Sequence, residues 1–222
     1  MKNNYQSFGL LLVTAIIASS SCEKKKYYEI NVNVENGSAY SAYINKIKAI
    51  TYEEEDVVIA TADYNNGITT LKLPLTITEN LYYLSEYADE ELIFSKPDVK
   101  VADLLFFACD DSEYVSDIYY IAENKTETSM EFIQGMYMYS DSDCSLTENY
   151  EYDGSQVTSN ANLKIGWNLL YAIQRGAYDP ITDTITHTRE ITSTPQSGLK
   201  WHLVISVSSE SPKTTHKSFF FM

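Results

Sequence analysis

Positive charge, histidine, cysteine and long apolar runs are all scarce in this sequence. Sixteen Lys and Arg residues stand against 31 Asp and Glu residues, which gives a formal net charge of −15 over 222 residues. A surface this acidic repels phosphate backbones, which argues against a nucleic-acid partner. No pair among the three cysteines and three histidines has zinc-site spacing, and the G-x-S-x-G, H-E-x-x-H and P-loop motifs are absent. We therefore expect no cofactor and no catalytic site.

Two of the three histidines lie in stretches that suggest ordinary strand positions. His202 is on the polar side of an alternating run, and His187 lies in a threonine-rich run. A hydrolase would need one of them beside a nucleophile and an acid, and no local signature places them there. We predict that both are solvated strand residues.

The apolar run near the amino terminus is too short to cross a membrane. It extends from Phe8 to Ala18, about eleven residues, whereas a transmembrane helix needs roughly twenty. Lys2 precedes this run, and the small side chains of residues 19–21 follow it, which is typical of a cleaved secretion signal. The sequence therefore predicts a signal peptide at residues 1–21.

The cysteine that follows the three serines suggests a lipid anchor. The stretch "LLLVTAIIASSSC" resembles the lipobox of bacterial lipoproteins, which implies that Cys22 is exposed by cleavage and acylated, for example with palmitate. Two or three acyl chains hold a protein firmly, because each buried methylene contributes roughly 0.8 kcal/mol. Residues 22–27 would then be a tether to the lipid bilayer. The alternative is an ordinary secretory signal that leaves Cys22 as a free thiol.

The mature chain has the composition and patterning of a β protein. Nineteen tyrosines and only five prolines favour strands. Residues 28–35 alternate strictly between apolar and polar, and Asn66-Gly67 predicts a tight hairpin between strands at 57–64 and 68–75. Short apolar runs separated by turn signals continue toward the carboxyl terminus. We predict an all-β protein built of antiparallel β-sandwich or barrel units.

One segment interrupts the strand pattern and one suggests a boundary. Residues 78–92 carry apolar residues at helical spacing, which predicts one short helix or an ordered loop. The stretch "SKPDVK" could link an N-terminal β-sandwich-like unit at 28–98 to a C-terminal β-rich unit at 99–222. A single domain is the alternative.

Two further stretches resemble landmarks of a family of uncharacterised lipoproteins from the Bacteroidetes. They are "IATADYNNGITTLKLP" at residues 59–74 and "LKIGWNLLY" at residues 163–171. The resemblance implies a cell-envelope protein of the outer membrane without assigned chemistry. In that group of bacteria, lipoproteins destined for the outer face often have acidic residues soon after the cysteine. Here Glu23 is followed by three lysines, which favours the periplasmic face.

Cysteines and acidic residues provide two candidate sites. Cys109 and Cys144 could form a disulfide in an oxidising compartment, or remain two buried thiols. Asp141, Asp143 and Glu148 offer hard oxygen ligands that suit Ca²⁺. The alternative for the acidic residues is a solvated turn.

Aromatic residues provide a third candidate site. Four tyrosines could form a platform on which a glycan stacks, and we expect the two tryptophans, Trp167 and Trp201, to be interior residues. Asp183-Thr184-Ile185 resembles a bacterial O-glycosylation acceptor, with Thr184 as the modified residue. The tyrosines are Tyr137, Tyr139, Tyr150 and Tyr152.

These observations favour a lipid-anchored binding or interaction module whose partner is a glycan or an envelope protein. A structural component of an envelope or surface assembly is the alternative, and a hydrolase is the third choice.

Overall fold

The described residues of the computed structural model are 25–35, 37–53, 55–86, 91–111, 113–152 and 154–204. The predicted signal peptide and Cys22 lie outside them. No helix in these ranges is long and apolar enough to cross a membrane.

The fold is all-β, as predicted, and its only described helices are two short 3₁₀ turns. Within residues 78–92, where the sequence predicts one short helix or an ordered loop, the chain forms the strand β5 (Tyr82–Tyr83) and the short 3₁₀ helix η2 (Leu84–Glu86); residues 87–90 lie outside the described part. The elements are β1 (Tyr27–Asn33), η1 (Gly37–Tyr40), β2 (Lys46–Tyr52), β3 (Asp56–Asp63), β4 (Ile68–Pro74), β5 (Tyr82–Tyr83), η2 (Leu84–Glu86), β6 (Ile93–Phe94), β7 (Lys100–Asp110), β8 (Glu113–Lys125), β9 (Ser129–Ser140), β10 (Cys144–Tyr152), β11 (Ser155–Leu163), β12 (Gly166–Asp179), β13 (Thr184–Thr192) and β14 (Lys200–Val204).

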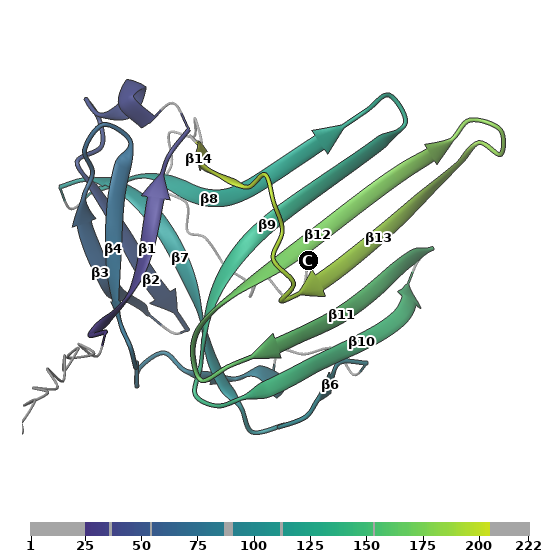
Figure 1. The fold of residues 1–222 in the computed structure, drawn as a ribbon, viewed down its shortest axis with the longest axis horizontal. Helices are drawn as coiled ribbons and strands as arrows, with labels where there is room; N and C mark the ends of the chain where they lie inside the picture. Colours follow the sequence, from purple (N-terminus) through teal and green to yellow (C-terminus); the bar gives the residue numbers. More distant parts are fainter. Residues whose placement is uncertain are drawn as a thin grey trace, which may run out of the picture.

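The strands form a two-stranded sheet and one large open sheet (Figure 1). Strands β1 and β4 pair with each other, and the large sheet has the order β3-β2-β7-β8-β9-β12-β13-β11-β10-β6. Strand β14 pairs with β8, and β5 pairs with β7. The large sheet stays open, because β3 and β6 at its two ends do not pair with each other. The structure therefore adopts the sandwich of the two predicted architectures.

The two-stranded sheet packs against β2, β7 and β8 to form the sandwich, at the left of Figure 1. Alternation along β1 and β4 turns one apolar face inward, as the sequence indicates. Both predicted interior tryptophans are buried, Trp167 at 8% exposed and Trp201 at 5%. Residues on both sides of position 98 contribute to this core, which includes Ile30, Val32, Ile47, Leu71, Leu73, Leu104, Phe106, Trp167 and Trp201.

The Asn66-Gly67 turn has the predicted geometry and closes one antiparallel bridge, between Asn65 and Ile68. Both residues have positive φ, 51° at Asn66 and 88° at Gly67, as a tight turn requires. However, β3 pairs with β2 and β4 pairs with β1, so the turn carries the chain from one sheet of the sandwich to the other. The predicted hairpin is therefore limited to this single bridge, because beyond it β4 lies opposite the large sheet, where Leu71 and Leu73 are completely buried.

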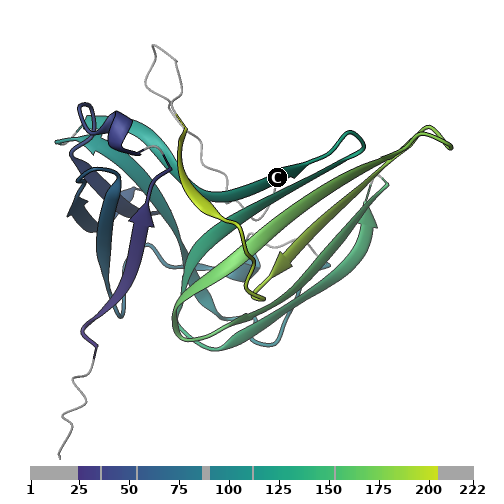
Figure 2. The same cartoon turned by 45° about the horizontal axis from the view of Figure 1, so that its top comes forward.

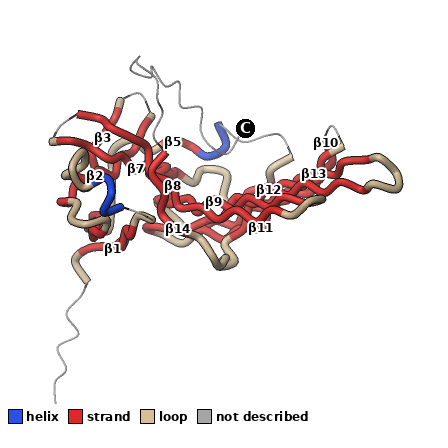
Figure 3. The backbone as a smooth tube through the Cα atoms, turned by 90° about the horizontal axis from the view of Figure 1, so that it is seen from above, coloured by secondary structure: helices blue, strands red, loops and turns tan. Residues whose placement is uncertain are grey.

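Beyond the sandwich, β8 to β13 continue as a long curved sheet (Figures 2 and 3). Residues 82–86 and 91–99 cover the base of one face, which we call the groove face, and contribute Leu84, Leu92 and Val99 to a core with Leu146 and Leu170. The opposite face, which we call the reverse face, carries a smaller core around Ile133, Tyr171 and Ile173. Leu92 marks the edge of the covered core on the groove face, and the outer part of the groove face extends from there over β9 to β13.

Candidate functional site

The outer part of the groove face forms a wide hollow. It is a groove of about 740 Å³ over strands β9 to β13, and Leu92 and Glu91 border it on the side of the covered core. A volume of this size is in the range of ligand sites. The strand register determines which side chains lie on its floor.

Strand pairing arranges the groove-face side chains in three rows. The middle row runs from Tyr150 on β10 through Val157 on β11 and Arg189 on β13 to Gln174 on β12 and Phe132 on β9. Neighbouring strands lie about 4.8 Å apart, so Tyr150 and Arg189 are about 10 Å apart along this row. The row toward the sheet's free end holds Tyr152, Ser155, His187, Gly176 and Met130, and the row toward the core holds Glu148, Ser159, Ile191, Ala172 and Gln134.

The floor of the groove offers side chains to a ligand and few backbone groups. Strands β11, β13 and β12 each have a partner on both sides, so ladder bonds occupy their N–H and C=O groups. An extended peptide cannot add to a strand that is already paired on both edges. Over these three strands, recognition must therefore come from rings, amides, hydroxyls and charges that project from the sheet.

Arg189 is the central cation of the groove. Its side chain is exposed, and none of the ion pairs formed by the described residues involves it. Its cross-strand neighbours Val157 and Gln174 are uncharged. Long basic side chains on such a face keep the charged head in water while the stem lies along apolar surface.

The other arginine belongs to the reverse face. Arg175 Nε lies 2.7 Å from Glu131, and its Nη1 lies 2.9 Å from Glu190. The hydrogen bond from Arg175 lowers the pKa of Glu131, and the bonds to Glu190 and Glu131 raise the pKa of Arg175. This triad bridges β9, β12 and β13 and fixes the register beneath the groove.

A glycine beside His187 leaves room for the imidazole ring. A Cβ on Gly176 would lie 3.6 Å from His187 Nδ1, which is ordinary van der Waals contact, so the ring lies close over the glycine. In the described part of the chain, neither His187 nor His202 hydrogen-bonds to a serine, cysteine or carboxylate side chain. That arrangement offers no activated nucleophile.

Two of the four predicted platform tyrosines lie in the groove, and two belong to the sandwich core. Tyr150 and Tyr152 line the groove, and Tyr152 is 72% exposed. Tyr137 stacks on Trp201 at 6.2 Å between ring centroids, and Tyr139 is only 4% exposed. A platform of four tyrosines is therefore wrong, because Tyr137 and Tyr139 are held inside by their tryptophan contacts.

The predicted disulfide does not form in this structure. Cys109 and Cys144 are both buried free thiols on strands that do not pair, β7 and β10. Cys144 Sγ lies 3.7 Å from the Lys96 carbonyl oxygen, and burial raises the pKa of the Cys109 thiol. The physical reason is strand order, because β10 lies near the far end of the sheet from β7.

The predicted calcium ligands are engaged separately. Among the described residues, no three His, Cys, Asp or Glu side chains form a group that could hold a metal ion. The hydrogen bond from Lys164, 2.8 Å, and that from the Ile165 N–H lower the pKa of Asp143. Asp141 accepts from the Lys100 N–H, and Glu148 accepts from the Ser159 hydroxyl. The predicted calcium site is therefore wrong, because the three carboxylates bind different partners instead of converging on one point.

Thr184 is exposed at the first position of β13, next to the turn that joins β12 to β13. Its hydroxyl lies 2.8 Å from that of Thr182. Such a position is accessible to a modifying enzyme, as the O-glycosylation prediction requires.

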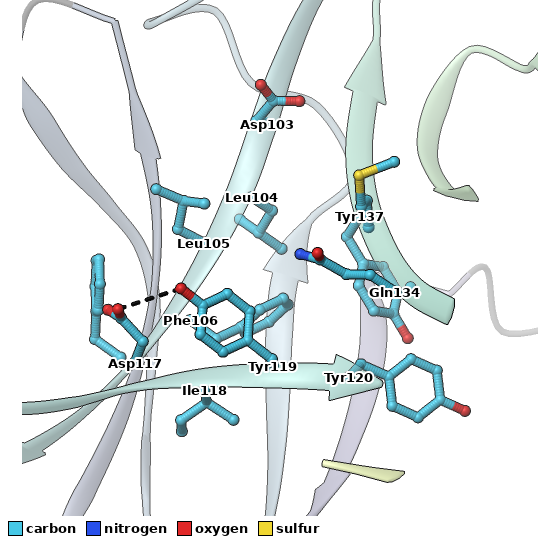
Figure 4. A pocket seen from close by; sticks show the side chains of 13 residues that line it. Asp103, Leu104, Leu105, Phe106, Asp117, Ile118, Tyr119, Tyr120, Gln134 and Tyr137 are labelled. Atoms are coloured by element: carbon cyan, nitrogen blue, oxygen red, sulfur yellow. Dashed lines mark hydrogen bonds between the residues drawn. The ribbon is translucent and has the colours of Figure 1, made fainter. Parts of the chain in front are cut away.

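A second, smaller hollow lies where β7, β8 and β9 separate. Strand β7 pairs with β8 at one end and with β9 at the other, and β8 leaves β7 to pair with β9. The gap of about 40 Å³ has room for a few waters at most and is too small for an organic ligand. Figure 4 shows the Tyr119 hydroxyl against Asp117, at 3.3 Å. Burial and this carboxylate raise the pKa of Tyr119 to about 12.

Sequence reasoning missed Arg189, Gln174 and His187 as groove residues. The available signal was weak: the chain has only two arginines, both in its last third, and His187 and Arg189 are two apart in a strand. The parallel pairing of β11 with β13, which brings them beside Tyr150, has no sequence signature.

Searches found no matching family model, no similar curated protein and no similar solved structure. The functional argument therefore rests on the geometry of the groove.

Proposed function

We propose that the protein is a lipid-anchored protein of the outer membrane, facing the periplasm, that binds an oligosaccharide in the groove. The observation that carries the proposal is the combination, on one paired sheet face, of the exposed Tyr152 ring and the half-buried Tyr150 ring with amide, hydroxyl and charged groups. Sugars present flat apolar faces and many hydroxyls, so they need both kinds of contact. The lipid anchor at Cys22 and the periplasmic face are proposed from the sequence alone.

The binding test uses the full-length protein, purified from membranes in mild detergent, against a panel of neutral and acidic oligosaccharides. We expect Tyr152→Ala to weaken the best ligand by about 3- to 10-fold, since an aromatic contact contributes about 0.5–1.5 kcal/mol beyond its buried area. The matched control is Tyr43→Ala, because Tyr43 is 68% exposed and remote from the groove lining. An unbound panel, or equal weakening in both variants, would contradict oligosaccharide binding.

The anchor has its own test. Intact mass of the membrane-extracted protein should show a fatty-acyl increment on a chain that begins at Cys22, and Cys22→Ala should remove it. Protection from added protease until the cells are lysed is expected for the periplasmic face. Digestion in unbroken cells would place the protein on the surface instead.

A structural role in an envelope assembly is the second candidate, and one observation favours it. The tip of the β12–β13 hairpin exposes Ile181 at 92% and Ile185 at 62%, with Tyr178 at 42%. Exposed apolar patches often mark protein contacts. Crosslinking in intact cells should then recover a specific neighbour that Ile181→Asp loses and Tyr152→Ala retains.

A further inference from the structure

We propose that the oligosaccharide carries a carboxylate and that Arg189 binds this group. The inference rests on the proposed function. It adds that the ligand is anionic and names the residue that binds its negative charge. Its starting point is the distribution of arginine over the two faces of the curved sheet.

The chain has two arginines, and among the described residues Arg175 is ion-paired whereas Arg189 is not. Arg175 donates to Glu131 and Glu190 on the reverse face. Arg189 is exposed on the groove face, and it takes part in none of the ion pairs among the described residues. In a chain with 31 acidic residues, a cation at the centre of a groove that forms no ion pair with any described carboxylate can bind an anionic group of a ligand.

The nearest positions around Arg189 are neutral or basic. Its row neighbours are Val157 and Gln174, and His187 follows two positions away on the same strand, about 7 Å along it. An anion bound by Arg189 therefore meets no carboxylate from an adjacent position on the sheet.

The carboxylates that border the groove lie farther away or face elsewhere. Glu148 is two strands and one row from Arg189, about 12 Å, and accepts a 2.7 Å hydrogen bond from Ser159. Glu151 and Glu190 alternate to the reverse face, and Glu91 borders the covered end. Their repulsion of an anion at Arg189 is weakened by this separation and by solvent.

The geometry of the middle row suits an acidic sugar better than an isolated anion. A guanidinium binds a carboxylate through two parallel N–H bonds, and the adjacent Gln174 amide can hydrogen-bond to hydroxyls. Tyr150 lies two strands away, about 10 Å, where its ring can stack on a neighbouring sugar unit. An oligosaccharide along this row would place its acidic unit on Arg189 and a second unit on Tyr150.

The experiment compares matched ligands on the full-length protein in detergent. The probes are tetramers of galacturonate, glucuronate and mannuronate, each with a counterpart in which the carboxyl groups are reduced to alcohols. The variants are Arg189→Gln and Arg189→Lys. The control is Lys72→Gln, which removes one positive charge at an exposed position of β4 in the sandwich. Circular dichroism and melting temperature establish that each variant folds.

We expect one acidic tetramer to bind at least about tenfold more tightly than its reduced counterpart, because a charge-assisted hydrogen-bond pair is worth about that factor or more. Arg189→Gln should abolish the preference, Arg189→Lys should retain part of it, and Lys72→Gln should leave it unchanged. Equal binding of acidic and reduced tetramers, or a preference that survives Arg189→Gln, overturns this inference and leaves oligosaccharide binding standing. Binding of no tetramer and no neutral sugar overturns both proposals.

Discussion

Removal of Trp201 should cost more stability than any surface change, because this side chain joins the sandwich to the curved sheet. Its ring stacks on Tyr120 at 4.9 Å and lies edge-on to Phe106 at 5.0 Å. Its Nε1–H donates to the Asn31 carbonyl oxygen at 3.2 Å, and its own carbonyl accepts from the Glu35 N–H at 2.8 Å. The side chain thus contacts β1, β7 and β8 from β14.

The expected magnitude follows from burial. An almost fully buried tryptophan removes roughly 200 Å² from water, which at about 25 cal/mol per Å² gives about 5 kcal/mol. Aromatic truncations in cores cost about 3–5 kcal/mol. We therefore expect Trp201→Ala to lower the free energy of unfolding by about 4 kcal/mol. Trp201→Phe retains a ring but leaves the Asn31 carbonyl without its indole donor, so we expect about 1–2 kcal/mol.

Urea unfolding followed by far-UV circular dichroism measures both variants. With a slope of about 2 kcal/mol per molar urea, the midpoint of Trp201→Ala should fall by about 2 M. Tyr43→Ala, which truncates an exposed ring, should change the stability by no more than about 0.5 kcal/mol. If Trp201→Ala lowered the free energy of unfolding by less than about 1 kcal/mol, the conclusion that this side chain joins the sandwich to the curved sheet would be refuted.

Three further predictions test other parts of the fold. Gly135→Ala should destabilise by about 1–3 kcal/mol in the same assay, because its Cβ would lie 2.5 Å from Tyr120 Cδ1, whereas Gly176→Ala should be tolerated. Because the pKa of Tyr119 is raised to about 12 from 10.0, its contribution to stability is fully present below pH 10 and is lost as the pH rises toward 12. Between pH 10 and 12, the free energy of unfolding of Tyr119→Phe should therefore fall less steeply with pH than that of the wild type. Equal slopes of the free energy of unfolding against pH would contradict this. In Cys22→Ala protein without reductant, Cys109 and Cys144 should react with a thiol reagent only after unfolding, and a denatured chain with no reactive thiol would show that they are bonded.

Local patterns in the sequence were sufficient to predict that the fold is all-β and which faces of its strands are buried. The alternation in β1 and along Leu71 and Leu73 gave the buried faces correctly, because side chains in a strand point alternately to opposite faces. The positive φ angles at Asn66-Gly67 and the end of β4 at Pro74 also follow from local chemistry. Each of these features depends on residues that are neighbours in the chain.

Candidate sites were predicted less well, because they depend on which strands pair. Tyr137, Tyr139, Tyr150 and Tyr152 have similar surroundings in the sequence, yet the first pair packs on tryptophans and the second pair lines the groove. Composition could not separate them, since the tryptophans that bury the first pair come from β12 and β14.

The sequence by itself therefore determined an acidic, all-β chain with two interior tryptophans. Only the tertiary structure decided that the Asn66-Gly67 turn crosses between sheets, that Cys109 and Cys144 remain apart, and that a groove exists. The groove depends on the parallel pairing of β11 with β13, which places Val157 beside Arg189 and Tyr150 next in the row. Strand order is set by the burial of whole faces against one another, and that free energy belongs to no local stretch of the chain.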